Sequence, residues 1–263
     1  MPLLRRLWVR LRPGGRQVRP RLLVRDRELM VNWYPGSSDR LVLVFTGKHG
    51  GRGRLGYLEF TKVSQGGDSN HVLFITDLKR SWYSRPGLRA RVTALVQGFI
   101  AGHGIAQVSA IGNSMGGYGA ILFCDHLPIS RVAAFVPQIL LTPEVIDAPN
   151  WVVERAAITD QVERDLVPIM RNSPARFTLV YGDQDHDDRR HLAHLPRADN
   201  IDVLVLPGRD HGVARWLKQQ GKLDHLAGAM INGDPAGVAD FRARMCPVPV
   251  PKLPMHHDAR SRT

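Results

Sequence analysis

The chain of 263 residues carries a net charge of +12, and most of that charge lies at its two ends. Residues 1–27 contribute a net +8 and residues 247–263 a net +2, so residues 28–246 are nearly neutral. This distribution, with no recognised nucleic-acid motif, argues against a nucleic-acid-binding domain. No apolar run approaches the roughly 20 residues of a membrane-spanning helix. Cys124 and Cys246 form neither a metal-finger spacing nor a disulfide framework, which favours the reducing cytoplasm.

The sequence predicts three parts: a basic arm (1–20), a globular domain (21–246) and a proline-rich tail (247–263) that leaves the domain as an extended segment. Apolar side chains of the arm fall near one face of a helix: Leu3, Leu4, Leu7, Trp8 and Leu11. Arginines fill much of the rest, a pattern compatible with weak contact to an anionic membrane surface. A solvated arm, or one that packs on its own domain, is the alternative.

Strand-like runs recur along the domain, and helical patterns fill most of the gaps between them. Strands are expected at 21–25, 28–34, 41–46, 71–76, 107–112, 131–136, 177–181 and 201–206, the first two as an antiparallel pair. Helices are expected at 88–102, 115–127, 161–171, 186–194 and 211–230. This alternation predicts an α/β fold, a mostly parallel twisted sheet with helices on both faces. The carboxyl ends of its strands would meet at one edge, where such sheets build their sites.

The clearest chemical signal is Gly112-Asn113-Ser114-Met115-Gly116, which separates a predicted strand from a predicted helix. A serine hydroxyl is a poor nucleophile until a base takes its proton, so it must stand clear of the sheet. A sharp strand-to-helix turn achieves this, and it requires glycine two residues away on either side because side chains would not fit there. The helix N-terminus also favours the negative charge that develops. We therefore predict Ser114 as a nucleophile.

The partners of such a serine follow in the order acid, then histidine, each after a later strand. His211 is the only histidine in the loop after the last predicted strand, and we predict it as the general base. The strand at 177–181 is followed by Gly182-Asp183-Gln184-Asp185. Asp185 is the expected acid, with Asp183 as the rival, and its carboxylate would fix the tautomer of the histidine.

Acyl transfer also needs hydrogen-bond donors for the tetrahedral oxyanion. One is expected to be the backbone N–H of Met115, the residue after the serine. The other should come from the loop after the third strand, where Gly47 and Lys48 are the candidates.

These motifs together resemble the α/β-hydrolase fold. The segment GNSMGGYGA at 112–120 looks like the nucleophile elbow of α/β-hydrolase esterases, and its Ser-Met-Gly-Gly core resembles the esterase-D-like members. The order and spacing of the motifs extend the resemblance over roughly residues 28–230. Asn113 stands where many of these esterases have histidine. The resemblance implies that 138–165, which interrupts the strand–helix rhythm, forms a cap over the site; ordinary packing helices are the alternative.

The loop after the fourth strand opens onto the same edge of the sheet. Trp82 and Tyr83 are candidates to line a substrate pocket, and Arg80 or Lys48 to receive an anionic group. Aromatic residues beside a site often only pack, which is the competing interpretation.

The sequence therefore predicts a cytoplasmic serine hydrolase that cleaves a small-molecule carboxylic ester or thioester through an acyl-Ser114 intermediate and needs no cofactor. Acyl transfer by the same acyl-enzyme is the nearest alternative, and a non-catalytic binding module on this scaffold is another. The sequence leaves the oligomeric state and the substrate open.

Two further patterns are typical of other functions. The loop from Thr46 to Gly53 resembles the nucleotide loop of short-chain dehydrogenases, but none of the five tyrosines has a lysine four residues on, as their catalysis requires. Residues 185–188 with His191 and His194 offer metal-ligating side chains at helical spacing, but a solvated helix start explains them as well, and we expect no metal.

Overall fold

The computed structural model describes residues 20–47, 60–142, 156–159 and 161–246. Residues 1–19 of the predicted arm, the predicted tail and half of the predicted cap (143–155 and 160) therefore lie outside the described residues, and so does Lys48. In the described part of the chain, no helix has the length and apolar character needed to cross a membrane. Both cysteines are present as free thiols.

Eight strands form one sheet, and all eight were predicted to within two residues of their bounds. They are β1 (Arg21–Arg25), β2 (Leu29–Tyr34), β3 (Arg40–Phe45), β4 (His71–Asp77), β5 (Gln107–Asn113), β6 (Ile129–Phe135), β7 (Arg176–Gly182) and β8 (Ile201–Leu206). Their order is β1-β2-β4-β3-β5-β6-β7-β8, with β2 antiparallel to both of its neighbours and the remaining pairs parallel. The predicted fold class and the antiparallel pair at its start are confirmed.

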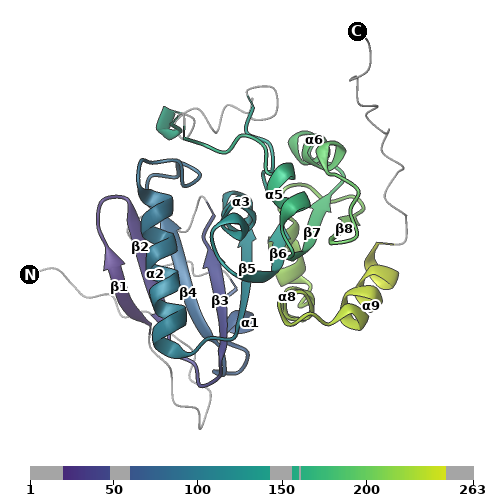
Figure 1. Cartoon of the computed structure of the whole chain (residues 1–263). Coiled ribbons are helices and arrows are strands. Elements are labelled where there is room, and N and C mark those ends of the chain that lie inside the picture. The colour runs from purple at the N-terminus through teal and green to yellow at the C-terminus, as the bar shows by residue number, and fades with distance from the viewer. Residues whose placement is uncertain (1–19, 48–59, 143–155, 160, 247–263) are drawn as a thin grey trace, which may run out of the picture.

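Helices cover both faces of this sheet (Figure 1). On the central strand β5, the Ser109 hydroxyl donates to the Ile231 carbonyl of α8 (Leu223–Asn232), whereas Gly112 lies against Gly116 of α3 (Met115–Leu122). Successive side chains of a strand point to opposite faces, so residues three apart mark the two layers. The central strands are buried on both faces, which explains their nearly continuous apolar sequences.

Most predicted helices are present, with some changes of extent. Besides α3 and α8, the helices of the described residues are α1 (Thr61–Gln65), α2 (Leu88–His103), α5 (Val167–Asn172), α6 (His186–His194), α7 (Val213–Gln219) and α9 (Pro235–Met245). The helix predicted at 211–230 is two helices, α7 and α8, because Gly221 between them has a left-handed φ of 67°. The helix predicted at 161–171 begins only at Val167, and α3 ends in a 3₁₀ turn at Phe123–Asp125.

Within the described residues, the sequence analysis missed two helices, α1 and α9, which differ in what could have revealed them. The Asp234 side chain caps α9 by accepting from the Gly237 N–H at 2.9 Å, and Pro235 occupies its first turn. An Asp-Pro pair is a recognisable helix start. The short helix α1 has no side-chain cap, and such a segment depends on packing rather than on local sequence.

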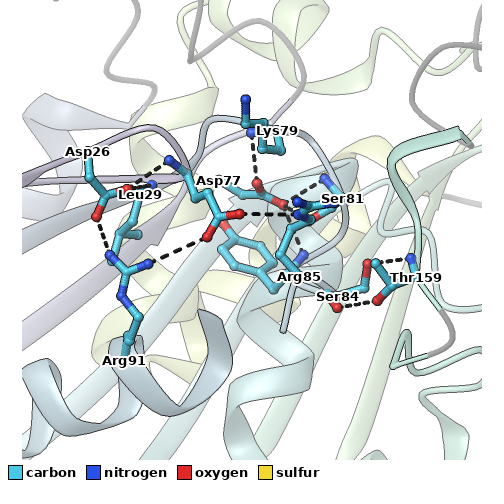
Figure 2. A network of polar contacts seen from close by, with 11 residues as sticks. Asp26, Leu29, Asp77, Lys79, Ser81, Ser84, Arg85, Arg91 and Thr159 are labelled. Atoms are coloured by element: carbon cyan, nitrogen blue, oxygen red, sulfur yellow. Dashed lines mark hydrogen bonds and ion pairs between the residues drawn. The ribbon is translucent and has the colours of Figure 1, made fainter. Parts of the chain in front are cut away.

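The loop after β4 is organised by one buried carboxylate, that of Asp77 (Figure 2). It accepts hydrogen bonds from the backbone N–H groups of Lys79, Ser81 and Tyr83, at 2.7–3.0 Å, and from the Ser81 hydroxyl. Three residues of this loop adopt a left-handed backbone: Arg80, Trp82 and Tyr83, with φ of 55°, 51° and 57°. Such backbone is held only where the surroundings determine it, and here Asp77 does so.

We expect Asp77→Ala to lower the free energy of unfolding by about 3 kcal/mol, because it leaves buried N–H groups of Ser81 and Tyr83 without an acceptor. Urea unfolding followed by circular dichroism measures this. The control is Asp224→Ala, which removes the exposed ion pair with Lys62 and should cost less than about 1 kcal/mol. Equal losses in the two variants would mean that Asp77 does not organise the loop.

Candidate active site

Ser114 occupies the sharp turn between β5 and α3. Its backbone is left-handed in φ, at 56°, with ψ at −120°, a combination that costs on the order of 1–3 kcal/mol for a residue with a side chain. Two backbone hydrogen bonds hold it: its N–H donates to the Phe135 carbonyl at 2.8 Å, and its carbonyl accepts from the Tyr118 N–H at 3.0 Å. Its strained conformation is that of a nucleophile elbow.

Glycines make this turn sterically feasible. A Cβ atom at Gly112 would lie 2.2 Å from the Gly116 backbone, and one at Gly116 would lie 2.2 Å from the Phe45 carbonyl oxygen. Both distances are far below any real contact. The helix α3 therefore approaches β3 and β5 as closely as it does only because these two positions lack side chains, as the sequence motif predicts.

The loop after β8 brings His211 to the serine, with Nε2 3.0 Å from the Ser114 Oγ. This loop is held to the end of β7 by two hydrogen bonds. The Gly208 N–H donates to the Asp183 carboxylate at 2.7 Å, and the Gln184 N–H donates to the Arg209 carbonyl at 2.9 Å. Asp183, the rival candidate for the acid, thus binds the backbone of the histidine loop.

The carboxylate on the other side of His211 is that of Asp188, and the assignment of Asp185 is wrong. His211 Nδ1 lies 2.8 Å from Asp188 Oδ1. Asp185 is the N-cap of α6, where its carboxylate accepts the backbone N–H groups of Asp187 and Asp188 at 3.0 Å. Three residues further on, Asp188 lies on the first turn of the helix and is fully buried. Counting residues from the strand end could not reveal this, because the helix sets the direction of each carboxylate.

Burial and charge shift the pKa values of this pair. Burial raises the pKa of Asp188, against the hydrogen bond and charge of His211, which lower it. Burial alone would lower the pKa of His211, but the hydrogen bond and charge of Asp188, with the charges of Asp185 and Asp187, outweigh it. The pKa of His211 therefore lies above 6.5. A histidine next to a buried carboxylate is a stronger base than one in water.

Among the described residues, His191 and His194, the other candidate metal ligands of α6, belong to no group of side chains close enough to hold a metal ion. His191 is buried, and burial, with the charges of His211 and His194, lowers its pKa to about 3. His194 contacts the Asp165 carboxylate at 3.0 Å. In the described part of the chain, the group with ligand atoms close enough for a metal, within 4.8 Å, is Asp185, Asp188 and His211. One oxygen of each of its two carboxylates accepts the hydrogen bonds given above, and Asp188 Oδ2 is buried without a hydrogen-bond partner among the described residues.

Of the predicted oxyanion donors, Met115 begins α3, directly after the serine. Gly47 follows β3 and is buried beside the elbow: its backbone nitrogen would lie 3.1 Å from a Cβ atom at Gly116. Lys48 lies outside the described residues, so both of its predicted roles remain predictions.

Trp82 and Tyr83 do not line an open pocket, so this prediction is wrong for both. Each is fully buried. The Trp82 indole N–H donates to the Gln138 side-chain oxygen at 3.0 Å, and Tyr83 would touch any side chain placed at Gly119 of α3. Tyr83 therefore packs on the helix that follows the serine, and Trp82 is bound to Gln138 after β6. Arg80, half-buried in the same loop, keeps its anion-binding role as a prediction.

Solved structures share this fold at low sequence identity. Over 81% of this chain and 97% of the other, it is similar to the capsule O-acetyltransferase of Neisseria meningitidis serogroup A, with a TM-score of 0.57 and 12% identity. The Pyrococcus furiosus esterase Pf2001 matches with a TM-score of 0.52 and 16% identity over 82% of this chain and 87% of its own. The esterase Est2 of Thermogutta terrifontis matches with a TM-score of 0.53 and 15% identity over 88% of this chain and 96% of its own.

Comparison of the sequence with protein-family models and with curated proteins gives no match. The structural similarities, together with the strand order and the elbow, identify the fold: the chain has the α/β-hydrolase fold of esterases. The resemblance drawn from the motifs at 112–120 is confirmed at this level.

We expect the imidazole of His211 to titrate above pH 6.5 in wild type and at lower pH in Asp188→Asn, because burial then acts without the opposing carboxylate. Asp185→Asn should lower this pKa less, since it removes only a more distant charge and asparagine still caps the helix. Histidine NMR titration measures this, with His191 expected to stay neutral above pH 5. A larger shift of the His211 pKa in Asp185→Asn than in Asp188→Asn would mean that Asp185 is the carboxylate that acts on the histidine.

Proposed function

We propose that this protein is a serine hydrolase that cleaves a carboxylic ester or thioester through an acyl-Ser114 intermediate. The observation that carries the proposal is the hydrogen-bonded chain Ser114–His211–Asp188, with 3.0 Å between Oγ and Nε2 and 2.8 Å between Nδ1 and Oδ1. A serine on a strained elbow, linked to a histidine whose second nitrogen contacts a buried carboxylate, is the arrangement that activates a hydroxyl. The fold shared with esterases supports this class of reaction.

In the proposed reaction, His211 Nε2 takes the proton of Ser114 as Oγ attacks the ester carbonyl carbon. Asp188 accepts a hydrogen bond from the Nδ1–H group, which keeps this proton on the imidazole. Its charge stabilises the imidazolium that forms, and the carboxylate does not itself become protonated. The N–H groups of Met115 and of Gly47 or Lys48 would bind the oxyanion. His211 then protonates the leaving alkoxide or thiolate, and water, activated by the same imidazole, releases the acid and free Ser114.

Acyl transfer to an alcohol is the second candidate, and the likeness to an O-acetyltransferase favours it. Transfer and hydrolysis share every step up to the acyl-enzyme and differ only in whether an alcohol or water attacks it. Both use the same residues and no cofactor. Product analysis in the presence of added alcohols separates them.

A fluorophosphonate probe should add once to wild type, with the adduct on Ser114, and not to Ser114→Ala or His211→Ala. The first variant lacks the nucleophile and the second lacks its base. Intact-mass spectrometry measures the adduct, and Ser130→Ala, which changes a serine on β6, is the matched control. An adduct on folded Ser114→Ala, or none on folded wild type, would contradict an activated Ser114.

We expect Asp188→Asn to lower kcat by roughly 10,000-fold, because an asparagine in this position stabilises the wrong histidine tautomer. Asp185→Asn should lower kcat by less than about tenfold, because asparagine is an equally good N-cap. Hydrolysis of a para-nitrophenyl ester gives both values. Comparable losses in the two variants would mean that both carboxylates act on His211 together.

A further inference from the structure

The side chain of Gln138 is buried, with 4% of its surface exposed, beside the helix that carries Ser114. It follows β6, and its preceding residue Pro137 packs against α3: a Cβ atom at Gly117 would lie 2.9 Å from the proline ring. The next residue, Ile139, accepts the Leu166 N–H at 2.9 Å. Gln138 therefore lies on a backbone that is fixed on both sides, directly after a proline that packs on the first turn of α3.

Its amide orientation follows from the chemistry of its partner. The Trp82 indole N–H can only donate, so the atom 3.0 Å away must be the carbonyl oxygen of Gln138. The amide NH₂ group consequently points away from Trp82. Among the residues that the structure describes, no hydrogen bond donated by this group is found, and its nitrogen is not one of the fully buried atoms without a partner, so it reaches the protein surface. A nearly buried side chain thus keeps two donor hydrogens available.

The sheet order places this pair across the site. Trp82 belongs to the loop after β4 and Gln138 to the segment after β6, and β3 and β5 lie between these two strands. The hydrogen bond therefore joins segments that follow the strands on either side of β3 and β5, and Gly47 and Ser114 follow these two strands. Figure 1 shows α3, which begins at the nucleophile, between the loop that follows β4 and the chain that follows β6.

We propose that Gln138 is a substrate-binding residue whose amide N–H donates to an oxygen of the substrate beside the scissile ester bond. This inference rests on the proposed function. It names a substrate class: esters that carry a second oxygen, as an ether, hydroxyl or carbonyl, on the acyl or the alcohol side. A purely hydrocarbon ester bound here would displace water from the amide donor without replacing its hydrogen bond, and sites built to bind an oxygen reject analogues that lack it. Trp82 positions the amide for this contact.

Two pairs of isosteric esters test the proposal. Para-nitrophenyl methoxyacetate against para-nitrophenyl butyrate exchanges one CH₂ for oxygen on the acyl side. Methoxyethyl acetate against butyl acetate does so on the alcohol side. Intrinsic reactivity cancels when the ratio of kcat/KM within a pair is compared between wild type and a variant. The pair whose ratio changes identifies the side of the substrate that Gln138 contacts.

Gln138→Glu keeps an acceptor for Trp82 but removes the amide donor, and Gln138→Met removes both groups at similar volume. In both variants we expect the ratio of oxygen-bearing to hydrocarbon ester to fall about tenfold in one pair. Trp82→Phe, which frees the amide to rotate, should lower the same ratio less. Gln97→Glu, the same change on an exposed position of α2, should leave both ratios unchanged.

Unchanged ratios in both pairs, with thermal unfolding showing folded variants, would overturn the proposal. So would an equal loss for both members of each pair, which is the signature of a purely structural residue. A failure of the proposed function is distinguishable, because wild type would then neither react with the fluorophosphonate nor cleave any of the four esters, and the assignment of Gln138 would fall with it.

Discussion

The close approach of α3 to the sheet at Gly112 and Gly116 is the constraint on which the site depends. With a Cβ atom at either position, the helix would have to move off β3 and β5, and Ser114 would leave its strained turn. The surrounding contacts oppose that movement: the Phe135 carbonyl binds the Ser114 N–H, and Pro137 packs on the first turn of the helix. The strain at one residue is thus held by packing from strands on both sides of β5.

Three aspartates after β7 divide the support of one histidine. Asp183 binds the backbone of the loop that carries His211, Asp185 caps α6, and Asp188 accepts from the imidazole itself. Because the cap fixes the first turn of α6, it also fixes the direction of the Asp188 carboxylate. Burial of that carboxylate raises its pKa, whereas its contact with the imidazole raises the pKa of His211. Geometry and basicity at Nε2 therefore depend on the same short segment.

Much of the fold could be predicted from local sequence patterns. Strands such as β3 and β4 are apolar on both faces because helices cover both, so their sequences mark their position without further information. Helix ends were predicted less well where glycine or packing decided them, as at Gly221, which separates α7 from α8. The elbow was predicted because its steric requirement acts within five residues. His211 was predicted because one loop holds one histidine.

The sequence by itself determined the class of fold, the sharp glycine-flanked turn at Ser114 and the strand-end loop that holds His211, since each depends on residues adjacent along the chain. The tertiary structure decided which carboxylate reaches the histidine, because Asp183, Asp185 and Asp188 differ only in direction, and α6 sets that direction. It also decided that Trp82 and Tyr83 face inward. The buried Asp77 carboxylate turns their backbone into a left-handed conformation, and no local pattern of aromatic residues encodes a contact with a carboxylate several residues away.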